Sequence, residues 1–137
     1  MNKAKMFTDG GSRGNPGPAA IGIVIYKDND EKVKEHGECI GNSTNNIAEY
    51  TALIRGLNLC KELGFTDVHC FLDSELVVKQ LNKVYKVKDE KMKILSDVVA
   101  GLITEFKTVK FEHVLRAKNK LADQLVNKAL DEAKWKI

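Results

Sequence analysis

The sequence predicts an α/β domain built on a five-stranded mixed sheet flanked by helices, and three observations support this class. The chain has 137 residues, which suits a single domain, residues 1–137, whose core needs no metal or disulfide to hold it. Apolar residues make up 43% and charged residues 30%, ordinary values for a globular protein. The apolar pattern begins with three strand-like runs and then alternates between strands and helices.

The first part of the chain predicts three strands joined by turns. Residues 3–8 form the first strand, and residues 19–26 (AAIGIVIY) are β-branched and apolar, as is typical of a central strand. Residues 10–18 hold both prolines and four of the ten glycines, which predicts a loop between these strands. The polar residues 27–32 predict a hairpin turn that leads to a third strand over residues 33–40.

Helices alternate with two further strands after this point. Helices are predicted over residues 45–63, 74–84, 90–106 and 119–133, and strands over residues 67–72 and 109–115. The order is βββαβααβα, which predicts an antiparallel start followed by right-handed crossovers. Two helices show apolar stripes at helical spacing: Ile47, Tyr50, Leu53, Ile54, Leu57 and Cys60 in the first, and Ile94, Val98, Leu102 and Phe106 in the third.

Cysteine usage and the absence of targeting patterns suggest an intracellular location. Cys39, Cys60 and Cys70 lie in apolar segments without a CxxC spacing, so we expect buried free thiols. No apolar run approaches the ~18 residues that span a bilayer, and the N-terminus lacks the apolar stretch of a signal peptide. We therefore expect a cytoplasmic protein with no membrane partner.

The net charge of +3 decides little, but its distribution is uneven. Residues 79–93 hold six lysines against two acids, and residues 107–120 hold five basic residues against one acid. Separated charge of this kind can present a basic face to a polyanion, although a solvated lysine-rich surface explains the same pattern.

Four carboxylates occupy positions where a solvated acid is not expected. Asp9 directly follows the first predicted strand, and Asp73 directly follows the fourth. Strand ends in α/β sheets are where ligand sites gather. Glu49 and Asp123 lie on predicted helices at helical spacing from inward-facing positions: Leu53, Gly56 and Cys60 for the first, and Val126, Asn127 and Leu130 for the second.

Each acid also has an ordinary structural explanation. Asp9 and Asp73 can be turn or N-cap residues, Glu49 can bond a first-turn backbone donor, and Asp123 can pair with a nearby lysine. If the four converge without a protein cation, a divalent metal ion is the simplest counter-charge, because an unpaired buried carboxylate is costly. Oxygen ligands favour Mg²⁺ or Mn²⁺, and the sequence has no Cys/His cluster suited to zinc.

The segments around these acids carry a specific resemblance. The strings TDGGSRGNPG (residues 8–17), NSTNNIAEY (42–50), LDSE (72–75) and NKLAD (119–123) follow one another in the chain. Together they resemble the type 1 ribonuclease H family over almost the whole sequence. The resemblance implies a ribonuclease H-like fold and an endoribonuclease that hydrolyses the RNA strand of RNA–DNA hybrids, leaving 5′-phosphate and 3′-hydroxyl ends.

The resemblance also implies a cofactor and roles for the acids. In this family an Asp-Glu-Asp-Asp set holds two Mg²⁺ ions, for which Mn²⁺ is a plausible substitute. Carried over by motif, Asp9 bridges the two ions, Asp123 lies on the nucleophile side, and Glu49 and Asp73 lie on the leaving-group side. Two such ions activate a water and offset the charge of the transition state.

The same resemblance implies the contacts to the substrate. Backbone groups of Gly10, Gly11 and Ser12 approach the hybrid closely, and Thr44 holds a DNA phosphate. Amides can donate and accept in the minor groove, where 2′-hydroxyls distinguish RNA from DNA. The amides that match groove-contacting family positions are Asn15, Asn45 and Asn46, although turn and cap chemistry is the alternative explanation for Asn15 and Asn45.

Three departures from the family pattern are visible. Glu75 stands where many relatives have Gln, and a carboxylate cannot donate to a base edge. The loop at residues 115–118 is short and has no His; His113 is expected to pack within the fifth strand, so Arg116 is the candidate for contacting the scissile phosphate or product. The basic handle of some relatives is also missing, and the 79–93 lysines are expected to replace it in part. These features match a short, archaeal-like subgroup.

Two other functions fit the same scaffold. One is a silent binding module for hybrids or double-stranded RNA, although all four acids are intact. The other is a related nuclease with a different substrate, such as double-stranded RNA, or a relative of the corresponding domain of a reverse transcriptase or integrase. We expect the protein to be a monomer.

Overall fold

A computed structural model describes residues 2–134 of the chain. Its elements follow the predicted order with a short 3₁₀ helix added before the last helix. They are β1 (Lys3–Ser12), β2 (Gly17–Lys27), β3 (Lys32–Ser43), α1 (Asn45–Glu62), β4 (Asp67–Leu72), α2 (Glu75–Leu81), α3 (Glu90–Ile103), β5 (Thr108–His113), η1 (Arg116–Lys118) and α4 (Lys120–Lys134).

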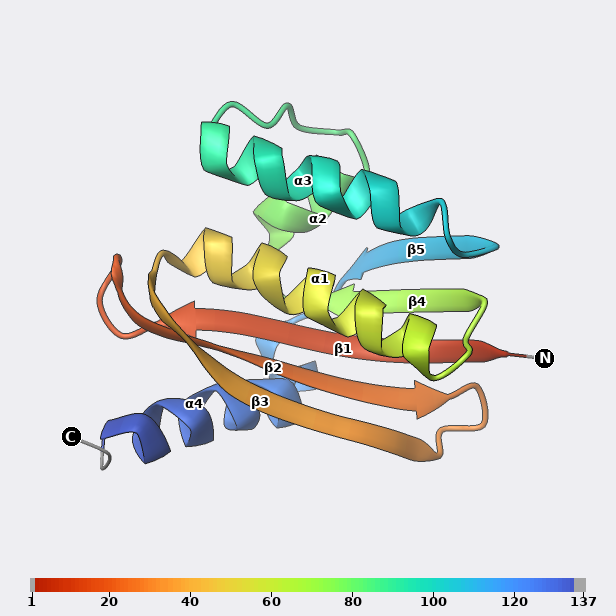
Figure 1. Cartoon of the computed structure of the whole chain (residues 1–137), viewed down its shortest axis with the longest axis horizontal. Coiled ribbons are helices and arrows are strands. Elements are labelled where there is room, and N and C mark those ends of the chain that lie inside the picture. The colour runs from red at the N-terminus through yellow and green to blue at the C-terminus, as the bar shows by residue number, and fades with distance from the viewer. Residues whose placement is uncertain (1, 135–137) are drawn as a thin grey trace.

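The five strands form one mixed sheet in the order β3-β2-β1-β4-β5 (Figure 1). β2 pairs antiparallel with both β1 and β3, whereas β4 is parallel to both β1 and β5. This confirms the predicted mixed sheet. It also places β1 at the centre of the sheet. Because β1 and β4 are parallel neighbours, their carboxyl ends lie beside each other at the same end of the sheet.

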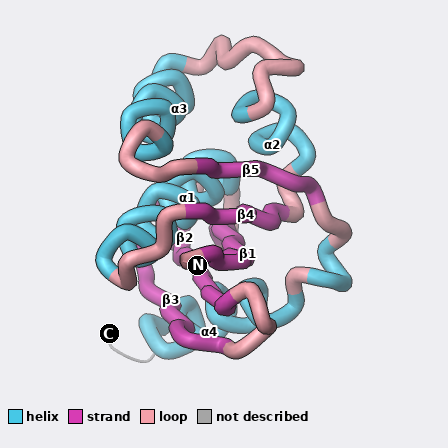
Figure 2. The backbone as a smooth tube through the Cα atoms, turned by 90° about the vertical axis from the view of Figure 1, so that its right-hand side faces the viewer, coloured by secondary structure: helices cyan, strands magenta, loops and turns pink. Residues whose placement is uncertain are grey.

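Helices cover both faces of the sheet, with α1 and α3 on one side and α4 on the other (Figures 1 and 2). The side chains of β2 divide accordingly. Ile21, Ile23 and Ile25 join the main core with α1, whereas Ala20 packs with Val126 and Leu130 of α4. Alternation along a strand buried on both faces explains why β2 is apolar at almost every position.

Two strand glycines, Gly22 and Gly37, lie where α4 packs on the sheet. Gly22 of β2 pairs with Gly37 of β3. A Cβ atom on Gly22 would lie 2.2 Å from the Ala122 carbonyl oxygen, and one on Gly37 would lie 2.9 Å from the Leu125 carbonyl oxygen. Glycine at both positions therefore allows the first turns of α4, which include Asp123, to approach the sheet closely.

Several predicted boundaries need correction. The glycine-rich segment is not wholly a loop, because β1 continues to Ser12 and pairs there with Ala19, leaving only residues 13–16 as the turn. The second helix ends at Leu81 rather than at residue 84, since Lys83 takes a left-handed conformation with φ 62°. The third helix ends at Ile103.

The apolar stripe predicted for the third helix is confirmed only in its second half. Phe106 is buried and Leu102 packs against the core, whereas Ile94 and Val98 are 63% and 43% exposed. Met92 and Val99 are buried instead, because packing against α1 selects the face that carries them.

The expected burial of all three cysteines holds for two of them. Cys60 and Cys70 are buried, whereas Cys39 is exposed on the edge strand β3. The Cys39 thiol donates to the Ala129 carbonyl oxygen of α4 at 3.2 Å. Among the described residues, no helix is long and apolar enough to cross a membrane.

Candidate active site

Two of the four acids lie side by side because β1 and β4 run parallel. Thr8 of β1 is in register with Leu72, the last residue of β4. Asp9 comes directly after Thr8 and Asp73 directly after Leu72, so both acids lie at the same end of the sheet. Asp9 is only 7% exposed. The predicted position of Asp73, directly after its strand, is confirmed, whereas Asp9 lies within β1 and pairs with Gly22 rather than following the strand.

Glu49 comes to the same place from α1. Its side chain is buried, and its Oε1 accepts a hydrogen bond from the Gly10 backbone N–H at 3.1 Å. A Cβ atom on Gly10 would lie 2.2 Å from the Ala48 carbonyl carbon, so glycine is what allows α1 to pack this close to β1. Carboxylate oxygens of Asp9, Glu49 and Asp73 lie within 4.8 Å of one another.

Burial and nearby negative charge disfavour ionisation of Asp9 and Glu49. Burial raises the pKa of Asp9 to about 7; a hydrogen bond with Glu49 lowers it in part, and the charges of Asp73 and Asp123 raise it further. Burial, followed by the charge of Asp9, raises the pKa of Glu49 well above its usual range. The Oε2 atom of Glu49 is buried and has no hydrogen-bond partner among the described residues. Such a cluster is suited to bind a cation.

Asp123 of α4 lines the same cavity but lies outside the group of three acids that come within 4.8 Å of one another, and it has a protein cation beside it. Its Oδ1 accepts from Arg116 Nη2 at 3.2 Å. The Arg116 side chain is 77% exposed, so this pair is largely screened by solvent. The expectation that all four acids converge without a protein cation therefore fails at Asp123.

Sequence reasoning did not single out Asn119, which is 2% exposed beside the acids. Its Nδ2 donates to the Thr8 carbonyl oxygen at 2.8 Å and to Asp73 Oδ2 at 3.1 Å. Its position four residues before Asp123 places both on one side of the start of α4, which is the signal that could have identified it.

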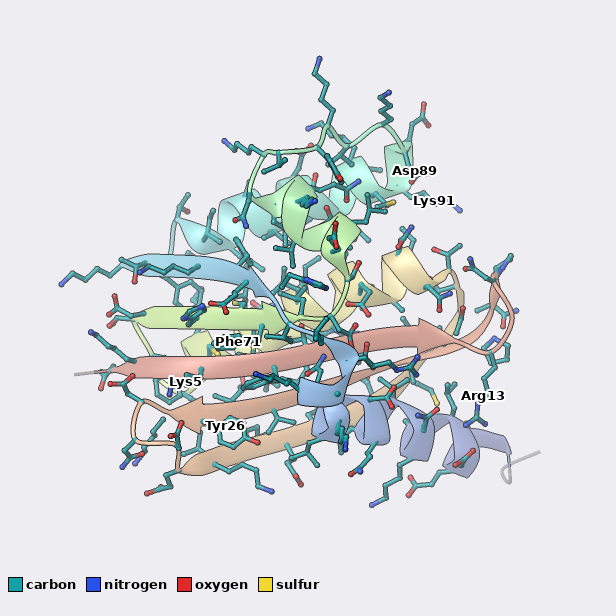
Figure 3. All side chains as sticks on the ribbon, turned by 180° about the vertical axis from the view of Figure 1, so that it is seen from behind. Lys5, Arg13, Tyr26, Phe71, Asp89 and Lys91 are labelled. Atoms are coloured by element: carbon teal, nitrogen blue, oxygen red, sulfur yellow. The ribbon has the colours of Figure 1, made fainter. Side chains whose placement is uncertain are left out.

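The acids border a cavity of about 480 Å³. Arg13 joins the turn between β1 and β2 to α4 through an ion pair with Asp131 at 2.6 Å (Figure 3). Most residues that line the cavity are polar or glycine: Asp9, Gly10, Gly11, Ser12, Arg13, Asn45, Asn46, Glu49, Asp73, Ser74, Arg116, Asp123 and Asn127, with Val126 and Leu130.

The predicted substrate-contact residues divide into two groups. Gly10, Gly11, Ser12, Asn45, Asn46 and Arg116 line the cavity, whereas Asn15 and Thr44 do not. Turn and cap chemistry does engage several of them. Asn45 Oδ1 accepts from the Ser12 N–H at 2.9 Å, Asn15 Oδ1 accepts from the Asn45 N–H at 3.0 Å, and Thr44 caps α1 by accepting from the Ile47 N–H. The bonds of Asn15 and Asn45 use their side-chain oxygens, so the NH₂ group of each of these two side chains takes no part in them.

The prediction for His113 is wrong, and the structure gives Glu75 an ion-pair partner. His113 does not pack inside the sheet: it is the exposed last residue of the edge strand β5. Its charge helps to lower the pKa of Glu75, although the main cause is a hydrogen bond from Lys79. Glu75 is exposed and pairs with Lys79 at 2.9 Å, and it does not line the cavity.

A mixed sheet in this strand order, with a group of carboxylates near the carboxyl ends of its two central parallel strands, defines the ribonuclease H-like class of α/β proteins. Solved structures agree. The crystal structure of RNase H1 from the halophilic archaeon Halobacterium salinarum has a TM-score of 0.93 at 42% identity over 95% of this chain and 98% of that one. LC11-RNase H1 in complex with an RNA/DNA hybrid has a TM-score of 0.91 at 42% identity, with 95% and 98% covered.

The sequence comparisons identify the family more closely. A family model described as reverse transcriptase-like matches residues 7–129. Ribonuclease H of Paracidovorax citrulli is 33% identical over 97% of both chains. The chain therefore belongs to the ribonuclease H family.

Some relatives are longer than this chain. Ribonuclease HI of Halobacterium salinarum is 43% identical over 93% of this chain, which spans 64% of that relative. The bifunctional protein Rv2228c of Mycobacterium tuberculosis is 42% identical over 96% of this chain, which spans 36% of it.

Proposed function

We propose that this chain is a metal-dependent endonuclease that hydrolyses the RNA strand of RNA–DNA hybrids and leaves 5′-phosphate and 3′-hydroxyl ends. The observation that carries the proposal is the cluster of Asp9, Glu49 and Asp73, whose carboxylate oxygens gather within 4.8 Å at the end of the central strands. Membership of the ribonuclease H family supports it, as does a relative of the same fold that binds an RNA/DNA hybrid.

The donor set fits hard divalent cations. Carboxylate oxygens are the ligands that Mg²⁺ and Mn²⁺ prefer, and the unpartnered Oε2 of Glu49 is an acceptor without a protein donor. We propose that Asp9, Glu49, Asp73 and Asp123 hold two Mg²⁺ ions, with Mn²⁺ able to replace them. When bound, the ions supply an activated water and offset the charge that develops on the phosphate and the departing 3′ oxygen.

The protein groups in this proposal hold and orient the reacting phosphate. Asp9, on the central strand, would be a ligand shared by both ions. Asp123 would hold the ion that activates the attacking water, and Glu49 and Asp73 would hold the ion that stabilises the departing 3′ oxygen. Arg116 is exposed and held at the cavity by a single ion pair, so its guanidinium can leave Asp123 and contact the scissile phosphate.

Recognition of the hybrid is proposed to use the rim of the same cavity. Gly10, Gly11 and Ser12 present backbone groups, and the free NH₂ groups of Asn15, Asn45 and Asn46 reach the minor groove, where the 2′-hydroxyls mark the RNA strand. Thr44 holds a phosphate of the DNA strand. The lysines of residues 79–93 lie on α2, on α3 and on the segment between them, at the end of the molecule where Figure 3 labels Asp89 and Lys91. They supply a sequence-independent phosphate contact.

One substrate panel tests the proposal. End-labelled RNA–DNA hybrid, double-stranded RNA and duplex DNA are incubated with Mg²⁺, Mn²⁺ or EDTA. We expect internal cleavage of the RNA strand of the hybrid only with metal, and loss of cleavage in Asp9→Asn. Cleavage restricted to double-stranded RNA would assign the alternative substrate, and binding without cleavage would make the chain a binding module.

We further propose that residues 1–137 act as one catalytic domain, and that the protein is a monomer in the cytoplasm with no membrane partner. Light scattering of the purified chain and fractionation of cells that express it test these two properties. A stable dimer or a membrane-bound fraction would contradict them.

A further inference from the structure

The buried side chain of Asn119 contacts two segments of the acidic site, and the residue itself directly precedes the third segment, α4. Asn119 lies directly before α4 and is 2% exposed. Its carbonyl oxygen accepts from the Asp123 N–H at 3.1 Å, the first backbone bond of α4. Its side-chain Nδ2 reaches the Thr8 carbonyl oxygen at 2.8 Å and Asp73 Oδ2 at 3.1 Å. Asn119 therefore joins the segments that carry Asp9, Asp73 and Asp123.

The two contacts fix the orientation of the amide. Both partners are acceptors, a backbone carbonyl and a carboxylate, so only the NH₂ group can face them. The Oδ1 atom is buried and has no hydrogen-bond partner among the described residues. The contribution of the Asn119 side chain is therefore its two N–H donors, both directed at the site.

A neutral donor has a consequence that a cation would not have. Arg116 opposes the charge of Asp123, whereas an amide bonded to Asp73 Oδ2 fixes the rotation of that carboxylate and leaves its charge available to a metal ion. A carboxylate held this way loses less rotamer freedom when it ligates. Partners that orient ligating groups typically contribute ~10- to 100-fold in metal affinity.

We propose that Asn119 is a positioning residue that holds the Asp73 carboxylate in the geometry that binds a divalent cation. This inference rests on the proposed function for its metal site. Its test uses Mn²⁺ alone, so that it does not depend on cleavage of any substrate.

Isothermal titration calorimetry measures Mn²⁺ affinity in the wild type, Asn119→Ala, Asp73→Asn and the double variant. We expect Asn119→Ala to weaken Mn²⁺ binding about tenfold or more. In the Asp73→Asn background, the same change should weaken it less than twofold, because the carboxylate that Asn119 orients is then gone. The matched control is Val99→Ala, a buried truncation in α3 that lines no part of the acidic cavity, and its Mn²⁺ affinity should equal that of the wild type.

Asn119→Ser provides a second variant if Asn119→Ala does not fold. Serine is favoured where a helix begins and can donate only one hydrogen bond, so we expect the folded protein with weaker Mn²⁺ binding. Mn²⁺ affinity within twofold of the wild type in the folded Asn119 variants would overturn the inference, as would an undiminished effect in the Asp73→Asn background. A wild type that binds Mn²⁺ but cleaves no hybrid would overturn the proposed function alone.

Discussion

Replacing Asp9 with Asn should stabilise the metal-free protein while removing its activity. The Asp9 carboxyl is buried against Glu49 and Asp73, and its pKa is raised to about 7. At neutral pH and above, the folded protein must therefore either ionise this carboxyl in an unfavourable environment or keep it protonated at a pH at which the unfolded chain has released the proton. An amide of the same shape carries no charge and can still bond with Glu49.

The magnitude and pH range of this effect follow from that pKa. A rise from 3.8 to about 7 corresponds to at most about 4 kcal/mol of stability, at ~1.4 kcal/mol for each pH unit. Below pH ~4 the carboxyl is protonated in both states and the penalty is absent. Between pH ~4 and ~7 the native state holds a proton that the unfolded state releases, so the wild type loses stability as pH rises. Above ~7 the penalty is constant.

Urea unfolding in EDTA across pH 4–8 checks this prediction, with Asp28→Asn as the control because Asp28 is exposed in the hairpin between β2 and β3. Asp9→Asn should gain stability over the wild type at pH 8 and not at pH 4, and the control should change little at either pH. Added Mg²⁺ should stabilise the wild type more than the variant. If Asp9→Asn is no more stable than the wild type at pH 8, the electrostatic argument is wrong.

Three further predictions test other parts of the structure. Gly22→Ala should destabilise the fold by roughly 2 kcal/mol or more in urea unfolding, because its Cβ atom would lie 2.2 Å from the Ala122 carbonyl oxygen. In the control variant Gly101→Ala, the added Cβ atom in α3 meets no atom within 4 Å, so the fold should gain up to ~1 kcal/mol of stability. Similar losses in both variants would contradict the close packing of α4. Arg116→Ala should change stability by less than ~1 kcal/mol because the side chain is 77% exposed, yet lower kcat roughly 10- to 100-fold in steady-state assays; an unchanged kcat would remove Arg116 from the site. Lys86→Ala should raise the KM for the hybrid and reduce the salt slope of binding by ~1, and an unchanged slope would show that this exposed lysine contacts no phosphate.

The strands and helices were predictable because each leaves a local pattern. The apolar run of residues 19–26 could only be a buried strand, and the helical spacing from Tyr50 to Cys60 identified the inner face of α1, which the structure confirms. The face of α3 was not predictable in the same way. Its sequence offers two apolar stripes, one through Ile94 and one through Val99, and the choice depends on a tertiary contact with α1 that the local sequence does not encode.

The acidic site was predictable for a related reason. Residues that break a local pattern, such as Asp9 and Asp73 at the ends of apolar runs, are visible in the sequence itself. The partners of the acids were not visible. The bond from Asn119 to Asp73 spans 46 positions, and the ion pair of Arg116 with Asp123 depends on how η1 leads into α4. Contacts of that kind follow from the packing of distant segments.

The spread of the acids along the chain also affects when the protein becomes active during its synthesis. Asp9 emerges from the ribosome early, but its partner on α4 is made more than a hundred positions later. Until α4 is made and packs on Gly22 and Gly37 of β2 and β3, the nascent chain lacks Asp123. Under the proposed function, a partly synthesised chain therefore lacks one of the four acids that would hold the metal ions.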